Sequence, residues 1–162
     1  PLNPVSVYGV QKAAAEGLVT AYGYHVLRLP YLFGPSIAPG KQHFYDLLTA
    51  DFKNGKSAGL YYDSLRSTLD YQTAADTIVR LAECNRTDTV PRILNVCGDA
   101  FLSKYDLGLM LAEKLGTPPH LAVPVTAYNP DTDPGARRAF AGLMDNALLK
   151  QTLGIEELTM TI

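Results

Sequence analysis

The chain alternates between stretches with helically spaced apolar residues and short stretches in which apolar and polar residues alternate. Residues 5–21 are rich in good helix formers and are followed by Gly23, which predicts a helix that stops there. Residues 24–30 (YHVLRLP) alternate and end at a proline, which predicts a short strand. Residues 31–40 are dense in glycine and proline and are predicted to form a loop.

The rest of the chain continues this alternation. Residues 41–55 carry an apolar stripe at helical spacing and predict a second helix. Thr73 and Ser103 are predicted N-caps of helices over 74–85 and 104–116, because a hydroxyl oxygen can accept from free backbone N–H groups. The other predicted elements are extended pieces at 58–63 and 66–71, strands at 92–98 and 121–125, an exposed loop at 128–138, and a final helix at 146–154 capped by Asp145 or Asn146.

Strands that alternate with helices favour an α/β fold. The long strand–helix units are too few for a complete doubly wound domain, so the chain looks like the later part of one. Its first residues, PLNP, read as the tail of a loop and include no initiator methionine. We therefore expect a part of a longer protein.

Composition excludes several classes of function. Of the 162 residues, 47% are hydrophobic and 19% are charged, which is typical of a globular domain. The net charge is −2 without a basic cluster, which argues against nucleic acid as a partner. No apolar run is long enough to span a membrane and no signal peptide is recognisable, so we expect a cytoplasmic protein. Cys84 and Cys97 are too few and too dispersed for a disulfide framework or a zinc site, and we expect buried free thiols and no metal.

Tyr8 and Lys12 form the sequence feature with the clearest chemistry. Four positions apart on a helix, they lie on one face about one turn apart. An ordinary phenol is too weak an acid to be ionised at neutral pH, and a nearby ammonium favours the phenolate by its charge. Such a pair can exchange a proton with a carbonyl or alcohol oxygen. The spacing alone also fits an ordinary surface pair.

Four blocks in order extend this motif over most of the chain: P-x-x-x-Y-G-x-x-K-x-x-x-E, HVLRLPYLFGP, LRSTLDYQTAADTIVRLAE and LMDNALLKQTLGI. Together they resemble the extended short-chain dehydrogenase/reductase family, also called NAD-dependent epimerase/dehydratases. The short second half and the LFG loop are most similar to its dTDP-4-dehydrorhamnose reductase branch. The residues that carry the first two blocks are Pro4, Tyr8, Gly9, Lys12, Glu16, Arg28, Gly34 and Pro35.

The resemblance implies a fold and a function. Residues 1–35 would be the last helix–strand unit of an incomplete Rossmann-like dinucleotide-binding domain, and 36–162 a small α/β substrate-binding region. The chain would be the C-terminal portion of an NAD(P)-dependent sugar-nucleotide reductase, using NAD or NADP and a nucleotide-sugar or similar small molecule. The alternatives are an NAD-dependent epimerase or dehydratase and a non-catalytic regulatory member of the superfamily.

The resemblance also implies roles for single residues. Tyr8 would be the catalytic acid/base, and Lys12 would favour its phenolate and bind the nicotinamide ribose. The cofactor would further contact the loop residues Pro30, Tyr31, Leu32 and Phe33, although a simple turn with buried aromatics explains this loop as well.

Two further residues are candidates for contacts with the substrate. His43 lies where the family often has a substrate-binding asparagine, and Arg66 matches an arginine that meets the phosphates in many relatives. A solvated histidine at a helix start, and a surface arginine paired with Asp63 or Asp70, are the alternatives.

The family's Gly-rich turn, which cradles the dinucleotide pyrophosphate, does not occur in this sequence. The family's upstream catalytic Ser or Thr is absent as well. We therefore expect that the chain alone is inactive and does not bind NAD(P) tightly. An open sheet edge would favour a homo-oligomer or association with the missing N-terminal half.

Overall fold

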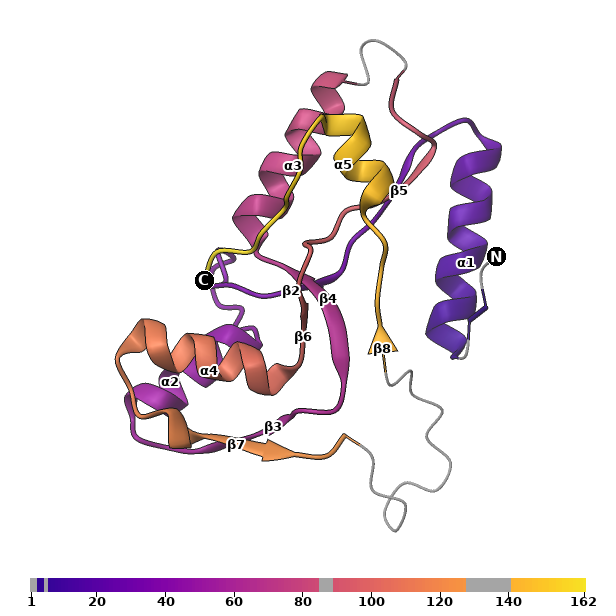
Figure 1. Ribbon diagram of the computed structural model, residues 1–162. Helices are drawn as coiled ribbons and strands as arrows, with labels where there is room; N and C mark the ends of the chain where they lie inside the picture. The colour runs from indigo at the N-terminus through magenta and orange to yellow at the C-terminus, as the bar shows by residue number, and fades with distance from the viewer. Residues whose placement is uncertain (1–2, 5, 85–88, 128–140) are drawn as a thin grey trace.

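The computed structural model describes residues 3–4, 6–84, 89–127 and 141–162. Its helices and strands alternate along the chain as predicted (Figure 1). In chain order they are α1 (Val7–Ala21), β1 (Val26–Arg28), β2 (Tyr31–Leu32), α2 (Phe44–Lys53), β3 (Ala58–Tyr61), β4 (Leu65–Leu69), α3 (Tyr71–Cys84), β5 (Ile93–Asn95), β6 (Phe101–Leu102), α4 (Lys104–Leu115), the 3-10 turn η2 (Pro119–Leu121), β7 (Ala122–Val125), β8 (Ala141–Gly142) and α5 (Ala147–Leu153).

Strand pairing joins segments that are far apart in the sequence. β1 runs parallel to β5, with Val26 opposite Ile93. β4 pairs in parallel with β2 and β8 and antiparallel with β6, and so is the centre of the largest sheet. β3 and β7 form a separate parallel pair.

Two hydrophobic clusters hold these elements together. One cluster lies in the lower half of Figure 1, where α2 and α4 pack with β3 and β7, and Phe52, Leu107 and Leu111 are almost fully buried in it. The other lies above it between α3, α5 and β5, with Leu94 and Leu149 at its centre. Burying a leucine side chain of this kind stabilises the fold by about 2 kcal/mol relative to exposure.

The predicted caps of α4 are confirmed. The Ser103 hydroxyl accepts from the Asp106 backbone N–H at 3.1 Å, and the Asp106 carboxylate accepts from the Ser103 N–H at 2.8 Å. Gly116 ends the helix with a φ of 64°, a conformation in which a side chain would be strained. Cys97 is buried as predicted, whereas Cys84 is only partly buried, so the prediction of a buried thiol is wrong there.

The predicted cap at Thr73 is wrong. Helix α3 already begins at Tyr71, and the Asp70 carboxylate accepts from the Thr73 N–H at 2.8 Å. A carboxylate three residues upstream of that N–H is an equally suitable capping group. The helix predicted over 41–55, in contrast, starts later than predicted, at Phe44, with His43 as its N-cap residue.

Three short strands were not predicted. Tyr31 and Leu32, placed in a loop by their glycine- and proline-rich surroundings, pair with Thr68 and Leu69 of β4 as β2. β6 and β8 are also two-residue strands that pair with β4. Such strands are defined by their tertiary partner, not by a local pattern. The predicted loop at 128–138 lies outside the described residues.

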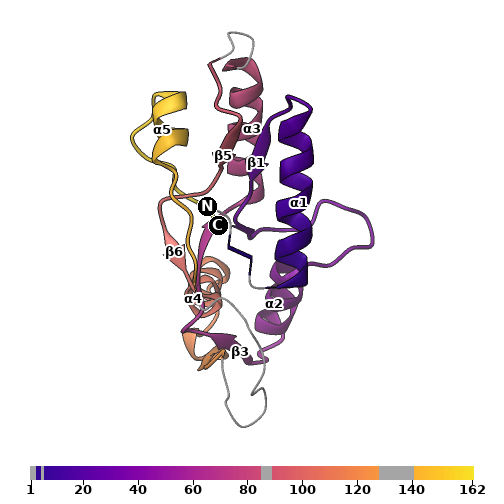
Figure 2. The same ribbon diagram turned by 90° about the vertical axis from the view of Figure 1, so that its right-hand side faces the viewer.

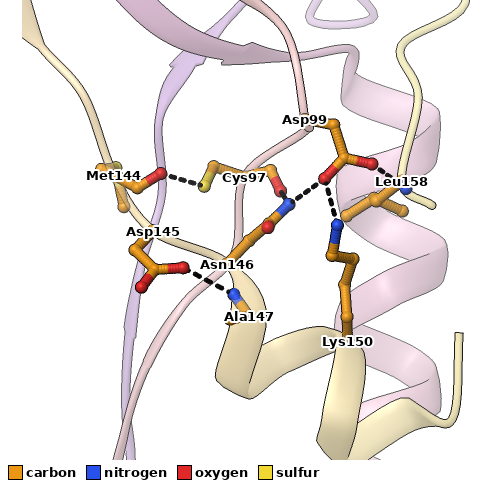
Figure 3. A network of polar contacts seen from close by, with 8 residues as sticks. All are labelled: Cys97, Asp99, Met144, Asp145, Asn146, Ala147, Lys150 and Leu158. Carbon is orange, nitrogen blue, oxygen red and sulfur yellow. Dashed lines mark hydrogen bonds and ion pairs between the residues drawn. The ribbon is translucent and has the colours of Figure 1, made fainter. Parts of the chain in front are cut away.

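A polar network around Asp99 ties α5 and the C-terminal segment to the end of β5 (Figure 3). The Asp99 carboxylate accepts from Lys150 Nζ, Asn146 Nδ2 and the Leu158 backbone N–H, each at 2.8 Å. The hydrogen bond from Lys150, with those from Leu158 and Asn146, lowers the pKa of Asp99 to about 2. The C-terminal segment is held a second time nearer its end, where the Asp70 carboxylate accepts a hydrogen bond from the Thr161 N–H at 3.0 Å.

None of the helices in the described part of the chain is long and apolar enough to cross a membrane.

Candidate functional site

Helix α1 begins where two side chains hold the incoming segment. The Ser6 hydroxyl accepts from the Gly9 N–H at 3.1 Å and so caps the helix. Pro4 lies against Gly9, since a Cβ added there would come within 3.0 Å of the Pro4 Cβ. A larger residue at position 9 would push Pro4 away from the turn that carries Tyr8. This explains in physical terms why a glycine follows the tyrosine in the motif.

Tyr8 and Lys12 lie together on an open face of α1, as their spacing predicts. Tyr8 is 68% exposed, and the Lys12 Nζ lies 5.4 Å from the centre of the Tyr8 ring. An ammonium at this distance is attracted to the ring. The phenol and the ammonium are therefore both accessible to a ligand.

Glu16, one turn beyond Lys12, anchors the helix to strand β1. The Arg28 guanidinium donates Nε–H to Glu16 Oε2 at 2.8 Å and Nη2–H to Oε1 at 2.5 Å, a bidentate pair. The Glu16 side chain is only 12% exposed, and its hydrogen bonds with Arg28 hold the pKa of the carboxyl below its usual value. Both groups therefore stay charged at neutral pH.

A hollow of about 690 Å³ opens between α1 and β1, within the range of small-molecule sites. Tyr8, Lys12, Glu16 and Arg28 all line it, together with apolar side chains of the helix and the strand. Helix α1 is the outermost element on this side of the molecule, to the right in Figure 1 and facing the viewer in Figure 2. None of the described residues of α1 is fully buried. The predicted association through an open sheet edge stays a prediction.

The predicted cofactor loop lines a second, smaller pocket of about 190 Å³. Tyr31 and Leu32 of β2 line it together with the following Phe33, but Pro30 is not part of the lining. Phe33 is 2% exposed and packs edge-on against Tyr45 at 5.1 Å between ring centres, so it also belongs to the core. Burial, helped by the nearby Tyr71, raises the pKa of Tyr31 to about 12, so its phenol keeps its proton at neutral pH.

His43 lines this smaller pocket as well, at the start of α2. Its ring centre lies 6.2 Å from that of Tyr71, which projects from the start of α3. Tyr71 also approaches Gly34, where an added Cβ would come within 3.0 Å of the Tyr71 ring. Three separate segments thus form an aromatic-walled pocket beside an exposed imidazole.

Arg66 occupies a different place. It lies on β4, and its Nη1 donates to the Leu65 carbonyl at 2.8 Å. A Cβ added at Gly142 would come within 2.7 Å of the Arg66 Cδ, so the side chain extends across β8. Arg66 lines neither of the two hollows described above.

A family model described as the RmlD substrate binding domain matches residues 1–160. The chain belongs to this family. The predicted resemblance to extended short-chain dehydrogenase/reductases is thereby confirmed, including its dTDP-4-dehydrorhamnose reductase branch. No curated protein sequence matches the chain significantly.

Several solved enzyme structures have a similar fold. A dTDP-glucose 4,6-dehydratase from Bacillus anthracis in complex with NAD is 21% identical, with a TM-score of 0.71 over 99% of this chain and 50% of that one. WbmG from Bordetella bronchiseptica, in complex with NAD and UDP, is 21% identical, with a TM-score of 0.72 over 99% and 47%. A UDP-N-acetylglucosamine 4-epimerase from Methanobrevibacter ruminantium M1 is 19% identical, with a TM-score of 0.69 over 96% and 49%. The predicted α/β fold is confirmed, and the chain spans about half the length of these structures.

Sequence reasoning for this RmlD-type domain missed two features of the site. Glu16 and Arg28 were only letters of a motif, and nothing in the sequence indicated that they bind each other across α1 and β1. Tyr71 was not singled out, because only the folded chain brings it to Gly34 and His43. Among the described residues, no group of three or more His, Cys, Asp or Glu side chains is placed to hold a metal ion.

Proposed function

We propose that this chain is the part of an NAD(P)-dependent sugar-nucleotide reductase that carries its acid/base pair and much of its substrate-binding region. The observation that carries the proposal is the exposed Tyr8–Lys12 pair on the open face of α1, in a chain of the RmlD substrate-binding family. Residues 1–35 would complete the cofactor-binding domain of the whole protein, and residues 36–162 would contact the substrate.

Tyr8 and Lys12 have the chemistry that carbonyl reduction requires. A nicotinamide cofactor, when bound, supplies the hydride. Tyr8 donates its phenolic proton to the carbonyl oxygen of a nucleotide-linked keto-sugar, and the Lys12 ammonium stabilises the phenolate left behind. Lys12 has further N–H donors for a ribose hydroxyl, and both side chains reach the 690 Å³ hollow.

These residues fit a cofactor only in part. The 162 residues contain no Gly-rich turn to bind the pyrophosphate, so the other half of the protein would have to supply it. The loop of Pro30, Tyr31, Leu32 and Phe33 would lie against the nicotinamide. Phe33 would act indirectly, by shaping the small pocket, because its own side chain is buried in the core.

His43 and Arg66 are proposed to bind the substrate. The small pocket beside His43 has room for a ring, not for a whole nucleotide-sugar, and its aromatic walls suit a planar or apolar face. Arg66 offers the fork of donors that matches a diphosphate. Replacing either residue would raise KM more than it lowers kcat, if each contacts a part of the substrate remote from the carbonyl.

Replacement of Tyr8 tests the proposal. In the whole protein that carries this chain, Tyr8→Phe is expected to lower the rate of NAD(P)H oxidation by a keto-sugar nucleotide about 10²- to 10⁴-fold. Tyr22→Phe is the matched control, because Tyr22 follows the same helix and is 79% exposed. A Tyr8→Phe protein with an undiminished rate would contradict the assignment, and a whole protein without any hydride transfer would favour a regulatory member.

An epimerase or dehydratase would use the same pair for a transient oxidation of the sugar. The dehydratase and the epimerase described above are such enzymes, but at 19–21% identity they show the fold alone. Net consumption of cofactor separates the two reaction classes, because a transient oxidation returns the hydride.

A further inference from the structure

We propose that Arg28 acts as a positioning residue for the acid/base pair: it occupies the Glu16 carboxylate and thereby leaves the Lys12 ammonium beside Tyr8. The inference rests on the proposed function, since it concerns the Tyr8–Lys12 pair. It assigns to the Glu16–Arg28 bond an electrostatic role in addition to joining α1 to β1.

The three side chains on α1 are spaced one turn apart. Tyr8, Lys12 and Glu16 occupy positions i, i+4 and i+8 on one face, and all three line the same hollow. Lys12 thus has a phenol one turn before it and a carboxylate one turn after it. A carboxylate attracts an ammonium more strongly than the face of a neutral phenol does.

The observed geometry resolves this competition in favour of Tyr8. The Lys12 Nζ lies 5.4 Å from the centre of the Tyr8 ring. Both oxygens of Glu16 instead receive hydrogen bonds from Arg28, at 2.8 and 2.5 Å. Among the described residues, Glu16 forms its ion pair with Arg28 and none with Lys12.

The charged and titratable residues around the pair come from α1 and β1 in the part of the hollow that the structure describes. Strand β1 packs against α1, and Arg28 is the titratable residue of β1 that lines the hollow. Lys12 and Glu16 are the charged residues of α1 that line the hollow beside Tyr8. The charges of Arg28 and Glu16 are opposite, so a variant that lacks both charged groups keeps the local net charge unchanged.

Removing Arg28 alone would release the Glu16 carboxylate one turn from Lys12. The ammonium would then be drawn toward Glu16, and the phenolate of Tyr8 would lose part of its stabilisation. Because Tyr8 is largely exposed, water screens the interaction strongly. Coulomb's law for unit charges about 6 Å apart, at an effective dielectric constant of about 40–80, then gives a change of roughly 0.5–1 pH unit in the midpoint of proton loss. The sign is fixed: Tyr8 would ionise at higher pH.

The test is the pH at which Tyr8 ionises in the whole protein, measured by NMR of ¹³Cζ-labelled tyrosine. The Tyr8 signal is assigned by its loss in Tyr8→Phe. In Arg28→Met the midpoint is expected to rise by about 0.5–1 pH unit, and in Glu16→Gln/Arg28→Met it is expected to return to within about 0.2 unit of the parent. Arg28→Lys keeps the charge and is expected to stay near the parent midpoint.

A Lys12→Met background shows whether the effect passes through Lys12. There, Arg28→Met is expected to move the midpoint by less than about 0.2 unit, whereas a direct charge effect of Arg28 would persist. If the bond only anchors the helix, the double variant, which also lacks the bond, will behave like Arg28→Met. That outcome, or a persistent effect without Lys12, would overturn the inference.

The pH dependence of hydride transfer gives a second readout. The part of the pH–rate profile that depends on ionisation of Tyr8 is expected to shift by the same amount and in the same direction as the NMR midpoint in each variant. If Tyr8→Phe leaves hydride transfer unchanged, the proposed function fails, while the NMR midpoints still test whether Arg28 controls the partner of Lys12.

Discussion

Replacing Asp99 with asparagine is expected to destabilise the fold at neutral pH, because one carboxylate serves three donors there (Figure 3). Oδ1 accepts from Lys150 Nζ and Asn146 Nδ2, and Oδ2 accepts from the Leu158 N–H. An asparagine has a single side-chain oxygen. Its NH₂ group would therefore face at least one of these donors, and the ion pair with Lys150 would be lost.

The pKa of Asp99 gives the size of the effect. The hydrogen bond from Lys150, and those from Leu158 and Asn146, lower the pKa from 3.8 to about 2. This difference corresponds to roughly 2.4 kcal/mol of stability. Since the side chain is 30% exposed, screening by solvent reduces the expected contribution to about 1–2 kcal/mol.

The sign of the pH dependence follows from the lowered pKa. The unfolded chain takes up this proton near pH 4, whereas the folded protein takes it up only near pH 2. The stabilisation is thus complete at neutral pH and is lost as the pH falls from about 4 to 2.

Urea unfolding followed by circular dichroism, from pH 7 down to pH 2.5, measures the effect. Asp99→Asn is expected to lower the free energy of unfolding by about 1–2 kcal/mol at pH 7 and by less than half of that at pH 2.5. Asp76→Asn is the control: Asp76 is exposed, accepts a hydrogen bond from Gln72, and should change stability by less than about 0.5 kcal/mol. An equal loss at both pH values, or no loss at pH 7, would refute the reasoning.

Two glycines and one cap provide further tests by the same unfolding assay. Gly98→Ala should destabilise by more than about 2 kcal/mol, because the new Cβ would lie 2.7 Å from the Thr68 carbonyl oxygen and 3.2 Å from that of Leu158, both on the backbone. Gly17→Ala is its matched opposite, because the site is open and lies within α1, and a gain of about 0.5–1 kcal/mol is expected. A loss of stability there would contradict a solvent-exposed helical position for Gly17. Ser103→Ala should cost about 1–2 kcal/mol, because the residue is fully buried and its hydroxyl caps α4; an unchanged midpoint would show that the cap does not contribute.

The sequence predicted best those elements whose ends carry their own signals. Helix α4 has a serine cap, a carboxylate three residues later and a glycine at its end, and all three act locally. β6 and β8 have no such signals, since each exists only because two residues reach β4 from a distant part of the chain. The boundary proposed at residue 35 stays a prediction, although β5, which lies beyond it, pairs with β1.

The candidate site divides in the same way. Tyr8 and Lys12 lie on one helix, so their spacing alone predicts that they meet, and they do. Glu16 and Arg28 lie on different elements, and the short strand that brings them together could not be placed against α1 from its sequence. Thr73 was chosen as a cap because it is a good capping residue, but Asp70 competes for the same N–H and wins with a charged acceptor.

The most direct test of the account is the fate of the hydride in the whole protein that carries this chain. With NAD(P)H deuterated at the transferred position and a nucleotide-linked keto-sugar, mass spectrometry is expected to find one deuterium in the product for each cofactor oxidised. Tyr8→Phe should abolish this transfer, and Tyr22→Phe should preserve it. Conversion of the sugar without net oxidation of the cofactor, or transfer that does not depend on Tyr8, would contradict the proposed reductase.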